Sequence, residues 1–462
     1  MLPDFALLRI FDFYLDKASI EAWHTLAHAC QTWRNVVFGS PRRLNLRLEC
    51  GASTPVREML DIWPPLPIHI VIGGLETQGI DNIIATLEHN DRIRDLSIFG
   101  IPRSERETIW AALQQPFPAL TNLQLSFMTE TPFPVVPASF LGGSALGLQT
   151  LRLECIPFPG LPNLLLSATH LVDLHLQRIP DSGPGYFPPE AMVTALFVLT
   201  RLENLEIWFK TPRSRADQKT RYLPPQTRTL LPALITLSFK GVTEYLEDLV
   251  TAIDAPLLDD LGIIFFHQLI FDTPQLTQLI NRTPKFKAHG DARVEFSYWD
   301  VTVALPQTFD GVIELGISCW PQSNWGLSSV VQLCSSSLPP AFIPAVEHLY
   351  IIQSNYSIQL SGWQENSQWL EFFHPFTAAK DLYIASEFTS RIALALQELV
   401  GERVLEVLPV LQALFLEEPL QSGPLQEAIE RFVSSRQLAG HHIAVSHWER
   451  GNVRSSHETD DD

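Results

Sequence analysis

The sequence has no long hydrophobic run and few cysteines. None of its 462 residues lies in a stretch that approaches the about 20 consecutive apolar residues of a membrane-spanning helix, so we expect no membrane contact. The five cysteines are scattered, with no Cys-x-x-Cys pair, which indicates a reducing compartment, cytoplasmic or nuclear. Asp4 stands where a secretory signal peptide carries basic residues, so we expect no such leader.

Positive charge is also scarce. The chain carries 32 Lys and Arg against 51 Asp and Glu, a formal net charge of −19. A surface of this sign repels nucleic acid, so general DNA or RNA binding is not expected. The exception is the basic stretch from Lys210 to Arg221, which we interpret either as a solvated loop or as a binding loop for an acidic or phosphorylated partner.

Sequence motifs of enzymes are missing as well. There is no G-x-x-x-x-G-K-[ST], no G-x-S-x-G and no H-E-x-x-H. His441, His442 and His447 come nearest to a metal cluster, but on a strand His442 and His447 face opposite ways. We therefore expect no catalytic residue, no metal and no cofactor.

What the sequence does contain is a recurring pattern, an apolar residue followed three positions later by Leu-x-apolar. In a strand the outer residues of Leu-x-Leu point to one face and the middle residue to the other. From residue 96 to residue 261 the central leucines are 27, 28, 23, 31, 32 and 24 residues apart, and the three last gaps are 34, 33 and 32. A weaker copy is expected near residues 294–296. The central leucines are Leu96, Leu123, Leu151, Leu174, Leu205, Leu237, Leu261, Leu315, Leu349, Leu382 and Leu414.

Between the copies lie amphipathic or Pro-rich segments, such as residues 106–120, that predict returning helices or loops. One strand and one helix cannot bury their own apolar faces, but stacked neighbours can. The pattern resembles the leucine-rich repeat family over residues 90–420, although the Asn or Cys column of that family is absent. The resemblance implies an α/β solenoid, an irregular horseshoe with a parallel sheet. Earlier strands at residues 44–48 and 68–72, joined by a helix at 55–63, place its start at residue 44.

The first forty residues have no strand period. Pro3 and Asp4 suit a first helical turn, Ser19 suits the cap of a second helix, and residues 39–41 end a third. Large apolar residues nearly encircle the first helix. Because a unit of this size buries too little surface, we expect these residues to dock on the repeats or on another protein.

Leu2-Pro3, Ile10-Phe11, Trp23 and Leu26-x-x-x-Cys30-x-x-Trp33-x-x-Val36 resemble an F-box over residues 1–43, of the kind joined to degenerate leucine-rich repeats in mushroom-forming fungi. The resemblance implies a non-catalytic substrate-recognition subunit of a Skp–cullin–F-box ubiquitin ligase. The box would bind a Skp-type adaptor and through it a cullin, and the repeats would present a protein substrate. The implied adaptor contacts are Leu2, Pro3, Leu7, Ile10, Phe11, Leu26, Cys30, Trp33 and Val36.

Two alternatives stay open. One is a repeat scaffold that binds a partner outside any ubiquitin ligase, with the three helices as a cap. The other is an enzyme, which would need a cleft of convergent titratable groups. Cys30 is interpreted as a small hydrophobe on the apolar face of the helices, not as a nucleophile.

The middle residue of each Leu-x-Leu faces away from the buried pair, where a substrate would bind. This column ends in three aromatic residues expected about 4.8 Å apart, which predicts a binding hot spot. The alternative is that the C-terminal cap (residues 421–448), with a helix at 425–440 and a strand at 442–448, packs over them. Residues 449–462 read as a disordered acidic tail. The candidate substrate contacts are Tyr350, Tyr383, Phe415, Arg152 and His175, from a column that reads Ser97, Gln124, Arg152, His175, Glu206, Ser238, Gly262, Gly316, Tyr350, Tyr383 and Phe415.

Overall fold

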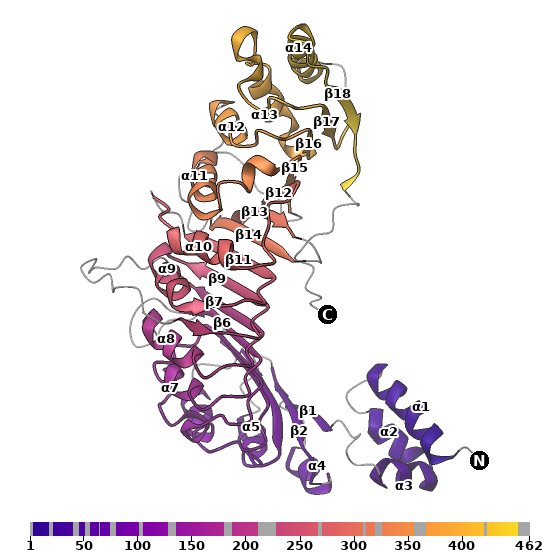
Figure 1. Cartoon of the computed structure of the whole chain (residues 1–462). Coiled ribbons are helices and arrows are strands. Elements are labelled where there is room, and N and C mark those ends of the chain that lie inside the picture. The colour runs from indigo at the N-terminus through magenta and orange to yellow at the C-terminus, as the bar shows by residue number, and fades with distance from the viewer. Residues whose placement is uncertain are drawn as a thin grey trace. The chain divides into compact units, whose positions relative to one another are not determined.

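The computed structural model describes residues 3–17, 22–39, 46–50, 56–63, 65–73, 80–100, 105–127, 135–179, 187–210, 228–266, 270–307, 311–318, 326–354, 366–419 and 423–450. They belong to two compact units, drawn in Figure 1: residues 1–210 with 229–233, and residues 211–228 with 234–462. The boundary predicted at residue 43, the basic stretch beyond Lys210 and the tail beyond Arg450 lie outside the described residues. The fold is α/β, an open and mostly parallel sheet with helices, which confirms the predicted class.

Three helices precede the first strand, and they share a small core of their own. They are α1 (Asp4–Lys17), α2 (Ala22–Ala29) and α3 (Gln31–Gly39). The core side chains, 3–8% exposed, are Leu7, Phe11, Leu26, Val36 and Val37. The expectation that these helices cannot bury their own apolar residues is wrong for these five, because α1 contacts both later helices through one apolar stripe. Phe5 and Ile10 of α1 remain exposed.

Seven strands form the described sheet of the first unit, in chain order and each parallel to its neighbours. The strands are β1 (Leu46–Cys50), β2 (Ile68–Ile72), β3 (Ile93–Phe99), β4 (Asn122–Ser126), β5 (Thr150–Glu154), β6 (Asp173–Ile179) and β7 (Asn204–Phe209). Between them run α4 (Val56–Ile62), α5 (Ile80–Leu87), α6 (Arg106–Ala112), η4 (Phe140–Gly143), α7 (Leu161–Leu165) and α8 (Pro189–Leu196). The strands predicted from the repeated pattern are thereby confirmed in this unit.

The leucines of the pattern line the core between strands and helices. On β5, Leu151 and Leu153 are buried while Arg152 between them is exposed. Strand register places Leu123 and Leu174 on either side of Leu151, and the helices lie on this leucine side of the sheet (Figure 1). Each fully buried leucine contributes about 1.5–3 kcal/mol relative to an exposed one, so the leucine layer between strands and helices stabilises the fold.

The second unit departs from chain order at one place. Its sheet runs β9, β11, β14, β13, β12, β15, β16, β17 and β18, and β13 is antiparallel to both neighbours. The bounds of these strands are β9 (Thr236–Gly241), β11 (Asp260–Phe266), β12 (Asp291–Phe296), β13 (Asp300–Pro306), β14 (Val312–Ser318), β15 (His348–Gln353), β16 (Asp381–Ile384), β17 (Ala413–Leu416) and β18 (Ala444–His447). The weak copy predicted near residue 294 is confirmed as β12. The sequence pattern misses β13, because its alternating residues Val301, Val303 and Leu305 do not form the full motif, an apolar residue followed three positions later by Leu-x-apolar.

The remaining described elements are two short strands and the helices of the second unit. The strands are β8 (Thr229–Leu230) and β10 (Ile253–Asp254). The helices are α9 (Thr243–Ala252), α10 (Pro274–Arg282), α11 (Leu327–Ser337), η6 (Ile343–Ala345), α12 (Asn366–Phe373), α13 (Ser386–Leu396), η7 (Gly401–Leu405) and α14 (Pro424–Leu438).

The register between β11 and β14 also departs from the predicted column of middle residues. Gly262 of β11 lies beside Glu314, two positions before Gly316, which the pattern assigns to the column. Gly316 lies opposite Thr302 of β13, where a Cβ atom would come within 2.7 Å of Thr302 Cγ2 and 2.9 Å of the Val301 carbonyl oxygen. Gly316 is therefore a close-approach position in the hairpin and not a member of the column.

The C-terminal segment forms a helix and a strand, as the sequence predicts. Arg436 of α14 is fully buried, and its guanidinium donates to the carbonyl oxygens of Val407 (2.6 Å) and Pro409 (3.4 Å). Burial lowers the pKa of Arg436 to about 10, which leaves it charged at neutral pH. β18 pairs in parallel with β17 and extends the sheet by one strand.

Glu247 of α9 caps the following helix. Its two carboxylate oxygens accept the backbone N–H groups of Gln275 and Leu276 in the first turn of α10, both at 2.9 Å. Burial raises the pKa of Glu247 from 4.5 to about 7, and these two hydrogen bonds only partly oppose the rise. The negative charges of Asp272 and Asp248 add to it.

We expect Glu247 to make unfolding pH dependent. Its folded pKa exceeds its unfolded one, so its contribution to stability is present in full below pH 4.5 and is lost as the pH rises to about 7. The melting temperature of the wild type, followed by circular dichroism, should therefore fall relative to that of Glu247→Gln over this range. The control Glu203→Gln, at an exposed glutamate, should show the same dependence of melting temperature on pH as the wild type. Parallel profiles for wild type and Glu247→Gln would contradict the assignment.

Candidate interaction surfaces

Polar side chains on neighbouring strands of the first unit bond to one another on the face away from the helices. Asp95 of β3 accepts hydrogen bonds from Thr121 (3.1 Å) and Asn122 (2.6 Å) and pairs with His69 of β2. Burial acts to raise the pKa of Asp95, but the contacts with these three residues outweigh it and lower the pKa. Asp173 of β6 is bonded to its neighbouring strands in the same way. These carboxylates tie strands together.

Two predicted substrate contacts, Arg152 and His175, are register partners on β5 and β6. His175 Nδ1 lies 3.0 Å from Glu206 Oε2, and Gln177 Nε2 donates to Glu206 Oε1 at 2.6 Å. The imidazole and the carboxylate are thus engaged with each other. Arg152 is exposed and forms no hydrogen bond or ion pair within the described part of the chain. Of the pair, only Arg152 offers a free charge to a partner.

The other three predicted substrate contacts form a stacked aromatic ladder (Tyr350, Tyr383 and Phe415) on β15, β16 and β17. The three residues are register partners. Ring centroids are 4.3 Å apart between Tyr350 and Tyr383 and 4.4 Å apart between Tyr383 and Phe415, with interplanar angles of 13° and 6°. All three side chains are partly exposed. The predicted adjacency of the three rings is confirmed, and their part in binding stays a prediction.

The C-terminal segment borders the aromatic ladder without covering it. Trp448, which is buried, meets Tyr350 and Tyr383 edge-on, with ring centroids at 6.3 and 5.6 Å. Its Nε1 donates to the carbonyl oxygen of Ile384 at 3.2 Å. α14 instead packs beside α13, on the helix side of the sheet (Figure 1). The alternative in which the C-terminal segment packs against the rings therefore holds in part, because Trp448 flanks the ladder. The rings still reach the surface, and the binding hot spot stays a prediction.

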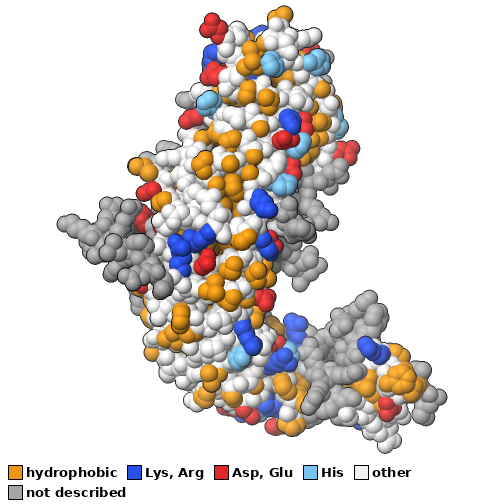
Figure 2. All heavy atoms as spheres, in the orientation of Figure 1, with side chains coloured by type: hydrophobic (Ala, Val, Ile, Leu, Met, Phe, Trp, Pro, Cys, Tyr) orange, Lys and Arg blue, Asp and Glu red, His pale blue; other side chains and the backbone are white. Residues whose placement is uncertain are grey.

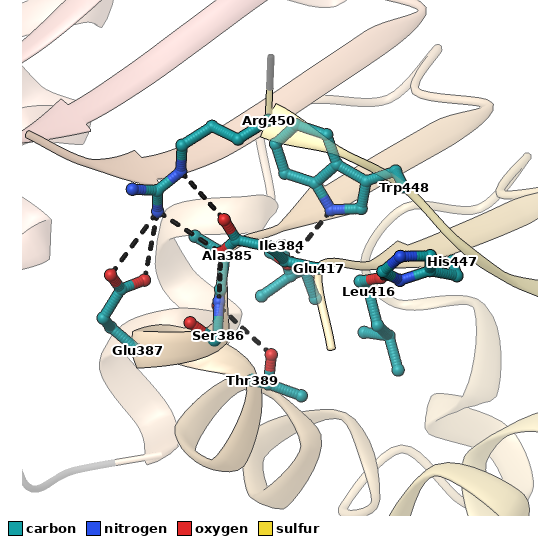
Figure 3. A network of polar contacts seen from close by, with 10 residues as sticks. All are labelled: Ile384, Ala385, Ser386, Glu387, Thr389, Leu416, Glu417, His447, Trp448 and Arg450. Carbon is teal, nitrogen blue, oxygen red and sulfur yellow. Dashed lines mark hydrogen bonds and ion pairs between the residues drawn. The ribbon is translucent and has the colours of Figure 1, made fainter. Parts of the chain in front are cut away.

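Arg450 holds this segment in place. Its Nη2 lies 3.2 Å from Glu387 Oε2 at the start of α13, and its Nε lies 3.1 Å from Glu417 Oε1 just after β17. Glu417 also accepts the backbone N–H of Ser386 at 2.9 Å. Figure 3 shows Arg450 reaching both carboxylates while the Trp448 indole points toward Ile384. One guanidinium thus joins three parts of the chain beside the ladder.

Charged side chains lie along the other side of the ladder. Asp291, His348 and Asp381 are register partners on β12, β15 and β16. His348 and Asp381 stand two positions before Tyr350 and Tyr383, and Asp291 stands two positions before Arg293, the register partner of Tyr350. His348 Nδ1 lies 2.7 Å from Asp381 Oδ2. Burial raises the pKa of the Tyr350 and Tyr383 phenols, and the nearby aspartates add to the rise. Over β15–β18, apolar, histidine and charged side chains share the face seen in Figure 2.

The predicted adaptor contacts on α1–α3 fall into a buried and an exposed group. The buried group needs correction, because side chains 3–8% exposed hold the helices together and do not reach a partner: these are Leu7, Phe11, Leu26 and Val36. The accessible group consists of Pro3, Ile10, Cys30 and, in part, Trp33. Leu2 lies outside the described residues. Pro3 and Ile10 are seven positions apart, so they share one face of α1.

Cys30 also departs from its predicted role. It is exposed, whereas the sequence places it on an apolar face. Its Sγ accepts the backbone N–H of Trp33 at 3.4 Å, the third residue of α3. Cys30 therefore occupies the N-cap position of α3 and satisfies one of the helix's free N–H groups.

Two exposed rings at the tip of the β12–β13 hairpin, Tyr298 and Trp299, escape the sequence patterns. Their centroids are 4.8 Å apart at an interplanar angle of 87°. Ser297 Oγ and Asp300 Oδ1 lie 2.6 Å apart across the turn. The Ser-x-x-Asp spacing is the available signal for this turn. Trp448 and Arg450 carry no local signal, because their partners are 30 or more residues away.

The described part of the chain holds no group of three His, Cys, Asp or Glu side chains placed to bind a metal ion. Among the helices described, none has both the length and the apolar content needed to cross a bilayer. No protein-family model matches the chain, and no curated protein matches it either.

Proposed function

We propose that this chain is a non-catalytic, intracellular substrate-recognition subunit of a Skp–cullin–F-box type ubiquitin ligase. The three helices α1–α3 bind a Skp-type adaptor and through it a cullin, and the strand-and-helix array, a leucine-rich-repeat solenoid, presents a protein substrate. The sequence resemblance to an F-box motivates this proposal.

The observation that carries the proposal is the surface of α1. The three helices bury five apolar side chains in a core of their own, yet Ile10 stays 48% exposed on the face of α1 that it shares with Pro3. Phe5 of the same helix is also exposed, at 74%. Two large apolar side chains exposed on one short helix of a small helical unit favour a protein contact more than a single one does. Ile10 is also one of the residues that the F-box resemblance marks as an adaptor contact.

A pull-down with a purified Skp-type adaptor tests the proposal. Wild type should bind, and Ile10→Asp should weaken binding by about tenfold or more, because it places a carboxylate in an apolar contact. Phe197→Asp is the matched control, since Phe197 is an exposed apolar residue of the first unit that the proposal does not use. Absence of binding by wild type, or equal binding by Ile10→Asp, would contradict the proposal.

The second candidate function is a protein-interaction scaffold outside any ubiquitin ligase. The aromatic ladder favours it, because the ladder belongs to the second unit and α1–α3 belong to the first. A chain that captures a partner through the ladder but binds no adaptor would support this function over the first.

A further inference from the structure

The aromatic ladder presents ring edges, not ring faces. Stacking at 4.3 and 4.4 Å covers both faces of the middle ring, Tyr383, with its neighbours. Tyr350 and Tyr383 are register partners, so their phenol groups lie side by side on neighbouring strands. Trp448 closes one side of the stack and is itself fixed by its bond to the Ile384 carbonyl oxygen. The ladder is therefore a preorganised strip of apolar edges and phenol oxygens. Because its side chains are already held in place, binding a partner costs little conformational entropy on this side of the interface.

The charges around the strip are mostly negative. On one side, Asp291 and Asp381 flank His348, and their side chains are 40% and 22% exposed. On the other side, Glu387 and Glu417 share the single guanidinium of Arg450.

On β12 the register partner of Tyr350 is Arg293, which pairs with Glu295 at 3.4 Å. Glu347 and Lys380, which precede His348 and Asp381, pair with each other at 2.7 Å and add one charge of each sign. With histidines neutral, the other charges around the ladder in the described part of the chain are five carboxylates and two guanidiniums. The five are Asp291, Glu295, Asp381, Glu387 and Glu417.

This combination selects the chemistry of the partner. A phosphate or an acidic peptide would meet carboxylates of its own sign. The middle ring of the ladder offers no face to a cation, because Tyr350 and Phe415 occupy both faces of Tyr383. A lysine or arginine fits, because its aliphatic stem packs on ring edges while its charged head reaches a carboxylate at the border.

We propose that this strip binds a basic, extended peptide segment of the protein substrate. Lysine or arginine side chains of the segment pair with Asp291 and Asp381, and their stems and neighbouring aliphatic side chains lie along the edges of Tyr350, Tyr383 and Phe415. From β12 to β17 the strip crosses three strand spacings, about 14 Å, which matches about four residues of extended chain. The proposal rests on the substrate-receptor function and names the class of substrate segment that it takes.

The test measures binding of four labelled decapeptides to the full chain by fluorescence anisotropy at about 150 mM salt. The peptides alternate leucine with lysine, arginine, glutamate or serine. We expect the lysine and arginine peptides to bind at least about tenfold more tightly than the other two. Equal affinity for all four, or no binding by any, would overturn the proposal.

Matched variants separate this site from the general negative charge of the chain. The double variant Asp291→Asn with Asp381→Asn should lower the affinity for the basic peptides by about fivefold or more. Glu203→Gln with Glu402→Gln removes the same charge from exposed positions away from the strip and should change affinity little. Equal losses in the two double variants would reduce the binding to non-specific attraction and overturn the proposal. If the double asparagine variant does not fold, Asp291→Asn alone replaces it.

Tyr383→Ala distinguishes a peptide from a second copy of this chain as the occupant. The substitution should lower the affinity for the basic peptides and leave the sedimentation coefficient of the chain unchanged. A shift in sedimentation without a change in peptide affinity would assign the strip to self-association instead. Because no adaptor is present in these measurements, failure here leaves the Ile10→Asp pull-down unaffected, and failure of that pull-down leaves peptide binding unaffected.

Discussion

Trp369→Ala is expected to lower the free energy of unfolding of the second unit by about 3–5 kcal/mol. Trp369 of α12 is fully buried and is ringed by four phenylalanines with centroids 5.9–6.1 Å away. These are Phe296, Phe372, Phe373 and Phe388. The rigid aromatic packing from β12, α12 and α13 cannot collapse into the space that the indole leaves, so the cavity persists.

Urea denaturation followed by circular dichroism checks this prediction. Because the chain has two compact units, more than one transition is expected, and only the transition of the second unit should move to lower urea. Trp299→Ala is the control, since Trp299 lies on the exposed hairpin tip and its removal should cost less than about 1 kcal/mol. Equal shifts for the two tryptophan variants would show that the aromatic cluster does not hold the second unit together.

Leu7→Asp is expected to unfold the three-helix unit. Leu7 is 4% exposed in a core of only five side chains, and an unpaired carboxylate there costs several kcal/mol, more than so small a core supplies. Hydrogen exchange read by mass spectrometry should show peptides from residues 3–39 losing protection. Peptides from β3–β7 should keep theirs.

Ile10→Asp is the matched variant for this experiment. Its side chain is already at the surface of α1, so exchange of residues 3–39 should stay close to wild type. The same comparison is needed to interpret the adaptor pull-down, because it separates unfolding from the loss of a contact. Loss of adaptor binding by Leu7→Asp reports an unfolded unit, whereas loss by Ile10→Asp reports a contact. If Leu7→Asp kept full protection, the core described for α1–α3 would be wrong.

The sheet was predictable where local pattern and burial coincide. Leu151-x-Leu153 and Leu382-x-Ile384 show which face of each strand is buried, because alternation along a strand has period two whatever its neighbours are. The aromatic ladder followed from the same rule, since equivalent positions on successive parallel strands become register partners. The helices at the start of the chain were predictable for the corresponding reason, the period of their apolar residues.

The predicted column failed at β14. The pattern assigned Gly316 to the column, but β14 pairs directly with β11 in a register that places Glu314 beside Gly262 and Gly316 beside Ile264. The antiparallel strand β13 lies on the other side of β14, where the pattern expected no strand. Pairing partners are chosen by contacts between distant residues, which a local pattern does not contain. The adaptor contacts were misjudged for a related reason, because the residues that define the motif also form the core of α1–α3.

Local sequence therefore indicates most strands and helices of this chain, β13 excepted, and which side of each is apolar, because those properties depend on neighbours a few residues away. Which apolar residues stay exposed depends on what packs against them. Leu7 and Ile10 are equally apolar, and only the packing of α1 on α2 and α3 separates them. In the same way, only the folded chain brings Trp448 and Arg450 to the ladder, since burial and ion pairing join residues that are far apart in sequence.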